Sequence, residues 1–573
     1  MIWWIFRSKM LEAEKASLAD LEGNVSWLKV DKWDYNNDYA MYVDFRIVHG
    51  GDEFAFQMIY PSVYPDAPPM IFTADRSRIS LHQYGADGEL CLEFRPDNWH
   101  PSITGTDMVK SCQRLLTEER TEGGEILHAR SAHIPSLGRD LRSKNLRLLI
   151  NEPEIKVLNA LAECTPEPLA LCKQRIESTF ISSIHYIGLK ENPVWESGLV
   201  VPNSNSNNYL NSTGFVVRIP GIKTQGIMKP DILKTLLDRT ELQELNNSLW
   251  ECDTYIYLLI GDEKNWKLYL IFDEPKKRQI ITYTTVQIPN ERQRLPVDYA
   301  KISKKRVGIV GCGSLGSKIA ASLCRSGVRN FLLIDEDILF PDNIVRNELD
   351  LRSFGVHKTF AMRDRLLNIA PTTKVNTLEM NLGGQESAML MTLALEALGN
   401  CDLLVDATAN AIAFNMIASV SKRNMKPMVW GEVFSGGIGG LVARSRPNLD
   451  PVPLSARQQI ITWCNDRNVD WVGDHGNYEG QDEDGQPLIA DDAEVSLIAS
   501  HVTRFALDIL VDPNGRNYPN SVYIVGFREA WLFEQPFETL PIDLQSDGVW
   551  GEDCDNLNLE DIRRILEKHS PQN

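Results

Sequence analysis

Residues 306–334 constrain the fold of this chain more strongly than any other segment. They read as an apolar strand (RVGIV), a glycine-rich turn, a helix (SLGSKIAASLCRSG) and a second apolar strand (NFLLI). A strand, a helix and another strand within roughly 30 residues form a βαβ unit, whose two strands are parallel. Further strand-like runs follow at 401–406 and 426–433. The C-terminal part of the chain is therefore predicted to be an α/β domain with a parallel sheet.

The turn after the first strand carries Gly311, Gly313 and Gly316 in the pattern GxGxxG. Glycines let the backbone approach a phosphate, and the N-terminus of the following helix offers unpaired N–H groups. Asp335 ends the next strand, where a carboxylate can bind ribose hydroxyls. In this context the turn indicates a nucleotide site, and a purely structural tight turn is the alternative.

Charged residues after the second strand favour a triphosphate over a dinucleotide. The polar and charged side chains that crowd positions 335–358 are Asp335, Asp337, Asn343, Arg346 and Lys358. Arginine and lysine bind phosphates, and a carboxylate can bind the accompanying magnesium ion. Asp406 ends a later strand at the rim where open α/β sheets bind ligands. Each residue alone also fits a solvated loop position, and only the set indicates function.

These motifs resemble the adenylyltransferases that activate ubiquitin-like proteins, the ThiF/MoeB/ubiquitin-activating superfamily. The resemblance spans about residues 300–510. Its elements are a GCGxLG loop, a strand-end Asp, an Asn-x-x-Arg element, a Lys after a glycine turn, and an Asp before a T-x-N turn. In this chain they are GCGSLG, Asp335, Asn343 to Arg346, Lys358 and Asp406. The C-terminal part is therefore expected to have a Rossmann-like adenylation fold.

The resemblance also implies a role for each of these residues. Asp335 is expected to bind the ribose of ATP, and Asn343 to orient a phosphate or the attacking carboxylate. Arg346 and Lys358 are expected to bind phosphates, and Asp406 to hold Mg²⁺. In the implied reaction a protein carboxylate attacks the α-phosphate and expels pyrophosphate. Cations stabilise the charge that builds on the phosphoryl oxygens, and no protein nucleophile is needed.

Residues 1–120 carry a second set of motifs. A helix is predicted at about 9–23 and strands at 40–50 and 53–60. A proline-rich turn (YPDAPP), a histidine, the run GELCL, a W-x-P element and a helix from about position 104 follow in order. The residues concerned are Tyr64 to Pro69, His82, Gly88 to Leu92, and Trp99 to Pro101. Over about residues 20–120 this order resembles ubiquitin-conjugating enzymes.

By this resemblance Cys91 is the thioester cysteine. A thioester keeps an acyl group transferable to an amine. The alternative is a buried strand position in ELCLEF. The family's His-Pro-Asn run, whose asparagine supports the oxyanion, is here His82-Gln83-Tyr84. Gln83, Tyr84 and His100 are the candidate donors in its place.

A second cysteine is a candidate for an intermediate thioester. Relatives that form their own thioester carry a cysteine after the Asp-x-T strand, and between 440 and 500 this sequence has Cys464 alone. Core packing in a helix is the alternative. The zinc-binding CxxC pairs of many relatives do not occur in this sequence. We therefore expect Cys91 to be able to capture the adenylate directly.

The fold class expected is a multidomain chain that is α/β and α+β. We expect a ubiquitin-conjugating-like α+β domain at 1–145, a linker or scaffold domain at 146–295, and a ThiF adenylation domain at 296–573. The middle segment shows no motif. The resemblance also implies a homodimer, because the activating modules of this superfamily are normally dimers. Arg292 and Arg294 are candidates for the arginine that a partner inserts into the ATP site.

Composition excludes some classes of function. The net charge of −19 argues against a nucleic-acid or membrane-surface binder. The 10 cysteines have no CxxC spacing, which favours reduced thiols in a cytoplasmic protein. The apolar start before Arg7 is too short for a signal sequence. Since no run approaches 18 apolar residues, no transmembrane helix is expected.

Together the resemblances imply one enzyme with two activities. It would adenylate a protein C-terminus with ATP and Mg²⁺, take it as a thioester on Cys91 and pass it to a target lysine. Such fusions resemble proteins of CBASS-type antiphage operons, in which conjugation primes a cGAS/DncV-like nucleotidyltransferase. Three alternatives remain open: an NAD- or FAD-dependent oxidoreductase, a ThiF-type activator of a sulfur carrier, and a non-catalytic scaffold.

Overall fold

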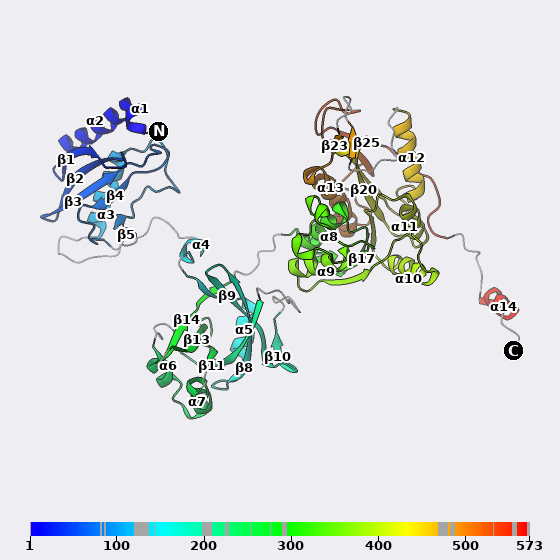
Figure 1. The fold of residues 1–573 in the computed structure, drawn as a ribbon, viewed down its shortest axis with the longest axis horizontal. Coiled ribbons are helices and arrows are strands. Elements are labelled where there is room, and N and C mark those ends of the chain that lie inside the picture. The colour runs from blue at the N-terminus through cyan, green and yellow to red at the C-terminus, as the bar shows by residue number, and fades with distance from the viewer. Residues whose placement is uncertain are drawn as a thin grey trace. The chain divides into compact units, whose positions relative to one another are not determined.

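The computed structural model divides the chain into two compact units, Met1–Ser143 and Lys144–Asn573 (Figure 1). The residues that it describes are 2–80, 83–84, 88–119, 137–142, 144–197, 209–222, 224, 229–251, 254–274, 277–288, 295–467, 479–481, 487–530, 532–552 and 559–569. Three residues named above, His82, Arg292 and Arg294, lie outside them. Helices and sheets alternate through both units, so the predicted mixed α/β and α+β character is confirmed.

The first unit is an antiparallel sheet with helices packed on it. The order of its six strands is β1–β2–β3–β4–β6–β5. They are β1 (Leu28–Tyr35), β2 (Met41–His49), β3 (Asp52–Ile59), β4 (Met70–Thr73), β5 (Gln83–Tyr84) and β6 (Glu89–Leu90). The helices are α1 (Trp3–Phe6), α2 (Ser8–Asn24), α3 (Gly105–Glu119) and α4 (Leu137–Asp140). The helix and the two strands predicted near residues 9–60 are confirmed as α2, β2 and β3.

Alternation along β2 explains how this sheet buries one face. Met41, Val43, Phe45 and Ile47 are buried, and the residues between them are more exposed. A strand with this period of two presents one apolar face. That face forms a single core with apolar residues of α2 and α3.

A buried carboxylate joins distant segments of the first unit. Glu14 of α2 accepts hydrogen bonds from the hydroxyls of Tyr60, at 2.9 Å, and Tyr64, at 2.5 Å. It also accepts one from the backbone N–H of Gly105, which begins α3, at 2.9 Å. Buried polar groups of this kind need such partners. Glu14 therefore fixes the proline-rich turn and the start of α3 against α2.

Residues 144–288 form a nine-stranded sheet of the second unit, in the order β14–β13–β12–β11–β8–β9–β7–β15, with β10 beside β9. The strands are β7 (Leu146–Ile150), β8 (Glu167–Ile176), β9 (Thr179–Leu189), β10 (Asn192–Glu196), β11 (Tyr209–Arg218), β12 (Tyr255–Gly261), β13 (Lys267–Glu274), β14 (Lys277–Thr282) and β15 (Thr284–Gln287). The helices are α5 (Glu152–Ala160), α6 (Pro230–Leu236) and α7 (Gln243–Glu251). The first and last strands along the chain, β7 and β15, pair in parallel.

This sheet buries both of its faces. Tyr257 and Leu259 of β12 lie in a cluster with Leu158 of α5. Leu258 and Ile260 of the same strand lie in a second cluster with α6 and α7. Successive side chains of a strand point to opposite faces, so the near-continuous apolar run YIYLLI indicates helices on both sides.

Residues 295–552 contain the parallel sheet that the sequence predicts. Its strand order is β18–β17–β16–β19–β20–β21–β24–β25. The strands β16 (Arg306–Val310), β17 (Asn330–Ile334), β18 (Lys374–Leu378), β19 (Leu403–Asp406) and β20 (Met428–Phe434) are parallel. The strands β21 (Gly439–Ser445), β24 (Val522–Gly526) and β25 (Thr539–Ile542) extend it antiparallel. The short β22 (Glu479–Gln481) and β23 (Pro487–Ile489) pair with each other.

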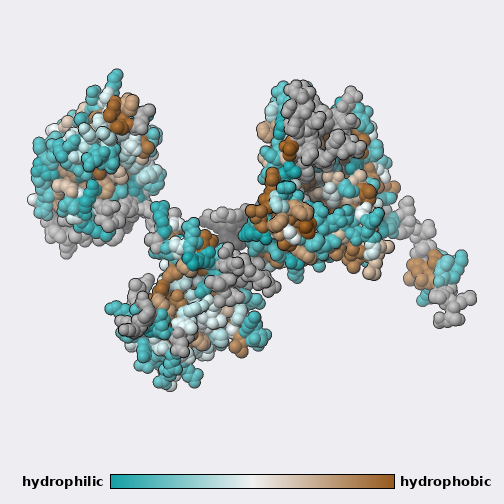
Figure 2. All heavy atoms as spheres, viewed as in Figure 1, coloured by the Kyte–Doolittle hydropathy of each residue, from teal (hydrophilic) through white to brown (hydrophobic). Residues whose placement is uncertain are grey.

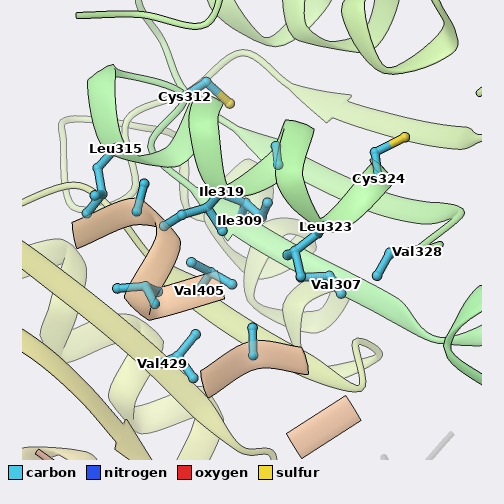
Figure 3. Close-up of a cluster of buried hydrophobic side chains, with 14 of the residues drawn as sticks. Val307, Ile309, Cys312, Leu315, Ile319, Leu323, Cys324, Val328, Val405 and Val429 are labelled. Atoms are coloured by element: carbon cyan, nitrogen blue, oxygen red, sulfur yellow. The ribbon is translucent and has the colours of Figure 1, made fainter. Parts of the chain in front are cut away.

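Helices cover both faces of the parallel sheet. One apolar cluster joins it to α8 (Ser314–Arg325), α9 (Lys358–Ile369) and α13 (Asp492–Val511). The other joins it to α10 (Ala388–Gly399), α11 (Ala411–Arg423) and α12 (Pro453–Asn465). In Figure 3, Leu323 of α8 lies beside Val307 of β16, and Ile319 lies beside Ile309. The βαβ prediction for residues 306–334 is thus confirmed.

The last helix along the chain is the amphipathic α14 (Leu559–His569). Its apolar side chains are exposed, with Leu559 at 81% and Leu566 at 61%, and Figure 2 shows them as a brown cluster beside hydrophilic residues. Among the residues that the structure describes, no helix is both long and apolar enough to cross a bilayer.

Candidate functional site

The glycine turn between β16 and α8 is closely packed. Gly311 has a φ of +89°, and a Cβ there would lie 2.7 Å from the carbonyl oxygen of Ala407, just after β19. A Cβ on Gly316 would lie 1.9 Å from the carbonyl oxygen of Gly311. Gly313 has no heavy atom within 4 Å of such a Cβ. The packing of the turn therefore requires glycine at positions 311 and 316, whereas a Cβ at Gly313 would lie in open space.

The carboxylate of Asp335 is tied to this turn. Its Oδ2 accepts a hydrogen bond of 2.6 Å from the backbone N–H of Cys312. Its Oδ1 accepts one of 2.8 Å from the N–H of Asp337. Burial raises the pKa of Asp335, and these two N–H groups together with Lys358 oppose that rise. The strand-end carboxylate predicted to bind ribose thus lies directly at the glycine turn.

Lys358 begins α9 and returns to the same strand end. Its Nζ lies 2.7 Å from Oδ2 of Asp337, and its backbone N–H donates to the carbonyl oxygen of Asp337 at 2.9 Å. The lysine is 8% exposed. The structure therefore brings Asp335, Asp337 and Lys358 together beside the glycine turn, as the sequence predicts.

The Asn-x-x-Arg element lies in a short 3₁₀ segment, η3 (Pro341–Val345), and the residue after it. Asn343 Oδ1 accepts a hydrogen bond from the N–H of Phe340 at 3.0 Å. Arg346 Nη1 donates to the carbonyl oxygen of Ala490 at 3.0 Å. The next residue, Asn347, donates from Nδ2 to the carbonyl oxygen of Cys312 at 3.3 Å.

A second group of charges lies at the ends of β19 and β20. Asp406 is 5% exposed, and its Oδ1 accepts hydrogen bonds from the hydroxyl and the N–H of Thr408, at 2.7 and 3.0 Å. Burial raises its pKa. Glu432 of β20 lies 3.9 Å from Nη2 of Arg457. Burial raises the pKa of Glu432 to about 7, Arg457 opposes the rise, and Asp406 adds to it.

Both groups lie at a topological switch point of the sheet. From β16 the chain runs outward to β17 and β18, then returns to place β19 on the other side of β16. Val310 and Asp406 are register partners at the carboxyl ends of these neighbouring strands. Open α/β sheets bind ligands in the crevice at such a point. The glycine turn lies between the Asp335–Lys358 group and the Asp406–Glu432 group.

The donors at this rim fit a magnesium ion that is shared with phosphates. Mg²⁺ usually binds one or two carboxylates, with substrate phosphates and water completing its shell. Asp406 and Glu432 supply such carboxylates, and Asp406 is buried where a cation would offset its charge. Over the described ranges, no cluster of three or more His, Cys, Asp and Glu side chains is arranged to hold a metal by itself.

In the first unit, Cys91 follows β6 and is partly exposed. Arg95 Nη1 lies 3.0 Å from its Sγ. Cys112 of α3 is buried, and burial raises the pKa of its thiol. The exposure of Cys91 suits the predicted nucleophile better than the alternative of a sealed strand position.

The candidate oxyanion donors differ in what they already bind. Gln83 Oε1 accepts from the N–H groups of Ile79 and Ser80, and its Nε2 donates to the carbonyl oxygens of Ser77 and Gly88. Its amide is thus used by the backbone. His100 Nδ1 lies 2.8 Å from Oγ of Ser102. The side chain of Tyr84 lies outside the described side chains.

Cys464 is 0% exposed in the core between α12 and the sheet. Burial raises its pKa to about 11. A thiol in such surroundings is inert compared with an exposed one. The position favours the core-packing alternative over an intermediate thioester.

Four residues at these sites were missed by sequence reasoning. They are Asn347, Glu432, Arg457 and Arg95. Glu432 had a usable signal, because it is a charged residue near the end of the predicted strand KPMVWGEV. The other three had none, because α12, η3 and the loop after Cys91 bring them into place only on folding.

Comparisons with known proteins place the C-terminal site in a family. The ThiF family model matches residues 287–481, which include the glycine turn, Asp335, Lys358 and Asp406. The C-terminal part of the chain therefore contains a ThiF-family domain.

Among curated proteins, the uncharacterized protein y4oA of Sinorhizobium fredii is 32% identical over 182 residues, 30% of this chain and 30% of that protein. The ATP-dependent ubiquitin transferase-like protein Cap2 of Vibrio cholerae is 28% identical over 132 residues, 22% of this chain and 21% of that protein. The matches thus span less than a third of either relative. Among solved structures, Escherichia coli MccB with ATP has a TM-score of 0.34 at 15% identity, covering 44% of this chain and 68% of that one.

Proposed function

We propose, from the ThiF-family match of residues 287–481, that the C-terminal part of this chain adenylates the C-terminal carboxylate of a protein with ATP. The similarity to Cap2 proteins, which are described as ATP-dependent and ubiquitin transferase-like, supports this class of reaction. The observation that carries the proposal is the set of charges around the glycine turn, because Asp335, Lys358 and Asp406 lie at one rim.

The residues proposed for this step differ in the role that each would have. Asp335 is already oriented by the Cys312 N–H and keeps lone pairs for ribose hydroxyls. Lys358 and Arg346 are the cations that would bind the phosphates. Asn343, which precedes both in the chain, would orient a phosphate or the attacking carboxylate. Asp406, with Glu432 beside it, would hold magnesium. The bound ion would neutralise phosphate charge as pyrophosphate leaves.

The adenylation step then needs only positioning and charge. The substrate carboxylate attacks the α-phosphate, an O–P bond forms, and the bond to pyrophosphate breaks. Lys358 and Arg346 stabilise the charge on the phosphoryl oxygens, where preorganised cations commonly supply several kcal/mol. The closed packing of Gly311 and Gly316 holds the α8 N-terminus in place for the phosphates.

We further propose that Cys91 takes the acyl group as a thioester and delivers it to a lysine of a target protein. The sulfur attacks the acyl carbon, a C–S bond forms, and AMP leaves. Cys91 suits this role because it is partly exposed, whereas Cys464 is sealed in the core. Joining both activities on one chain raises the effective concentration for the transfer.

The proposed partners follow the Cap2 similarity. The activated protein would be a cGAS/DncV-like nucleotidyltransferase in antiphage defence, or another protein with an activatable C-terminus. A homodimer is proposed for the active form. The domains at 1–145, 146–295 and 296–573 remain the proposed division of labour, with residues 146–295 as a scaffold.

The test incubates the full chain with ATP, magnesium and a candidate protein substrate. ATP–pyrophosphate exchange should depend on Asp335, Lys358 and Asp406. A thiol-sensitive adduct should form on wild type and on Cys464→Ala and should be lost in Cys91→Ala. An adduct that survives Cys91→Ala would overturn the thioester route. Tight NAD binding without pyrophosphate exchange would overturn the adenylation step and support an oxidoreductase.

A further inference from the structure

We propose that Arg95 is the positioning and charge partner of Cys91: its guanidinium stabilises the sulfur as a thiolate, both when the sulfur attacks and when it leaves. This inference deepens the thioester route proposed above and rests on it for its biological meaning. Its physical content concerns the free protein alone and can be tested without ATP or a protein substrate.

The contact itself is short, and the arginine that makes it is buried. Nη1 of Arg95 lies 3.0 Å from Sγ of Cys91, and Arg95 is 8% exposed. A cation next to a cysteine favours the thiolate over the thiol, and the thiolate is the nucleophilic form. The attraction between a charge pair grows as water is excluded. The carboxylate of Asp97 lies 3.9 Å from Nε of the same guanidinium, but its side chain is 61% exposed. The buried guanidinium therefore acts on the sulfur, 3.0 Å from Nη1, more strongly than a surface arginine would.

The loop that carries Arg95 is fixed at several points. The backbone N–H of Arg95 donates to Oδ1 of Asn98 at 2.7 Å, and Nδ2 of Asn98 donates to the carbonyl oxygen of Glu93 at 2.8 Å. The N–H of Glu93 donates to Oγ of Ser111 on α3 at 2.9 Å. These bonds close the loop after Cys91 and fasten it to a helix. The fold thus fixes the backbone position from which the guanidinium reaches the sulfur.

The neighbouring polar side chain is committed elsewhere. Gln83 stands one residue before the position of the family's asparagine, and both ends of its amide are bound to backbone groups of residues 77–88. Arg95 contacts the sulfur directly. Its charge therefore acts on the sulfur, which is a different atom from the oxyanion that the family's asparagine supports.

Arg95 would stabilise the sulfur of Cys91 in both chemical steps. Before attack the thiol loses its proton to solvent, and Arg95 stabilises the negative sulfur that remains. The C–S bond then forms, the bond from the acyl carbon to AMP breaks, and the sulfur becomes neutral. In the second step an amine attacks the thioester, the C–N bond forms, the C–S bond breaks, and the amine loses a proton to solvent. The sulfur leaves as a thiolate and meets Arg95 again.

The test follows alkylation of Cys91 by iodoacetamide against pH in the full chain, read peptide by peptide by mass spectrometry. In wild type the pH at which the alkylation rate reaches half of its maximum should lie below about 8.5, the pKa typical of a free thiol. In Arg95→Gln this midpoint pH should rise by about one unit, so that alkylation near pH 7 slows roughly tenfold. Arg95→Lys keeps the charge and should retain most of the effect.

The matched control is Arg114→Gln. Arg114 of α3 pairs with Glu93, which lies two residues after Cys91, and its side chain is 50% exposed. This variant should leave the pH profile of Cys91 unchanged. An unchanged profile in Arg95→Gln would overturn the inference. So would a wild-type midpoint at or above about 8.5, which needs no variant to fold.

The outcomes separate this inference from the proposed function. A low wild-type midpoint that depends on Arg95 supports the inference even if no thiol-sensitive adduct ever forms, in which case the thioester route fails. Equal profiles in wild type and Arg95→Gln, together with a normal adduct on Cys91, overturn the inference and leave the thioester route standing.

Discussion

The carboxylate of Asp335 accepts a hydrogen bond of 2.6 Å from the backbone N–H of Cys312. This bond ties the end of β17 to the turn that follows β16, so the residue proposed to bind ribose also holds the glycine turn. Recognition of the nucleotide and the shape of its cradle therefore depend on one side chain.

Asp335→Ala should weaken ATP binding by about tenfold or more, because a hydrogen bond to a charged group is commonly worth about 1.5–3 kcal/mol. Isothermal titration of the full chain with ATP measures the change. Asp364→Ala, on the exposed part of α9, is the control and should bind as wild type does. Equal affinities for wild type and Asp335→Ala would contradict the assignment.

Two glycines of the same turn should respond differently to alanine. At Gly316 the new Cβ would lie 1.9 Å from the Gly311 carbonyl oxygen, so α8 must move and nucleotide binding should be lost. At Gly313 the Cβ meets nothing within 4 Å, and Gly313→Ala should fold with a melting temperature close to that of wild type. Calorimetric melting and ATP titration of both variants provide the comparison. Equal damage from both would show that the turn is not packed as described.

The buried ion pair of Arg444 and Asp508 should be essential for stability. Nη1 of Arg444 lies 2.7 Å from Oδ2 of Asp508, and the arginine is 0% exposed. Asp508→Ala leaves the guanidinium buried without its counter-ion, which commonly costs about 3–5 kcal/mol. Urea unfolding of the C-terminal part measures the loss. Asp543→Ala, at an exposed position, is the control, and a loss below about 1 kcal/mol in Asp508→Ala would contradict the prediction.

Glu432 should make the C-terminal part less stable as pH rises. Its pKa is raised from 4.5 to about 7 on folding, mainly by burial. Between these values the folded state binds more protons than the unfolded state, so stability falls as pH increases and is level again above about 7. Glu432→Gln removes this loss.

Between pH 5 and pH 8 the free energy of unfolding of the variant should therefore rise relative to that of wild type, by on the order of 2 kcal/mol. Scanning calorimetry of both proteins in metal-free buffer at the two pH values tests this. A constant difference between wild type and Glu432→Gln at both values would contradict the burial of this carboxyl.

The sequence was sufficient to predict four of the five parallel strands, β18 (Lys374–Leu378) being the one that was missed, and the residues Asp335 and Asp406 that lie at strand ends. Asp335 and Asp406 were identifiable because apolar runs mark strands, and a polar residue right after such a run must lie at the rim. Lys358 was identifiable as one of the charged residues that follow the second strand, but its position could not be predicted, since it depends on how η3 and the chain to α9 fold back. The contact between Arg95 and Cys91 depends on the loop closure by Asn98, which no periodicity reveals.

The middle sheet shows another limit of sequence patterns. The apolar runs of β12 and β13 indicate strands, yet β11 pairs in parallel with β12 and antiparallel with β8. Strand order of this kind is set by long-range packing, which a local pattern does not contain. For the same reason Cys464 was left between two interpretations, because only the packed core shows which face of α12 it occupies.

Because β7 and β15 pair in parallel, residues 144–288 begin and end on neighbouring strands of one sheet. The start of β7 and the end of β15 lie at opposite ends of this strand pair. They are separated by about four residues of strand, roughly 13 Å. Loops inserted or removed between these two strands leave that span unchanged. The intervening polypeptide can therefore lengthen or shorten in evolution without altering the reach required of the segments on either side.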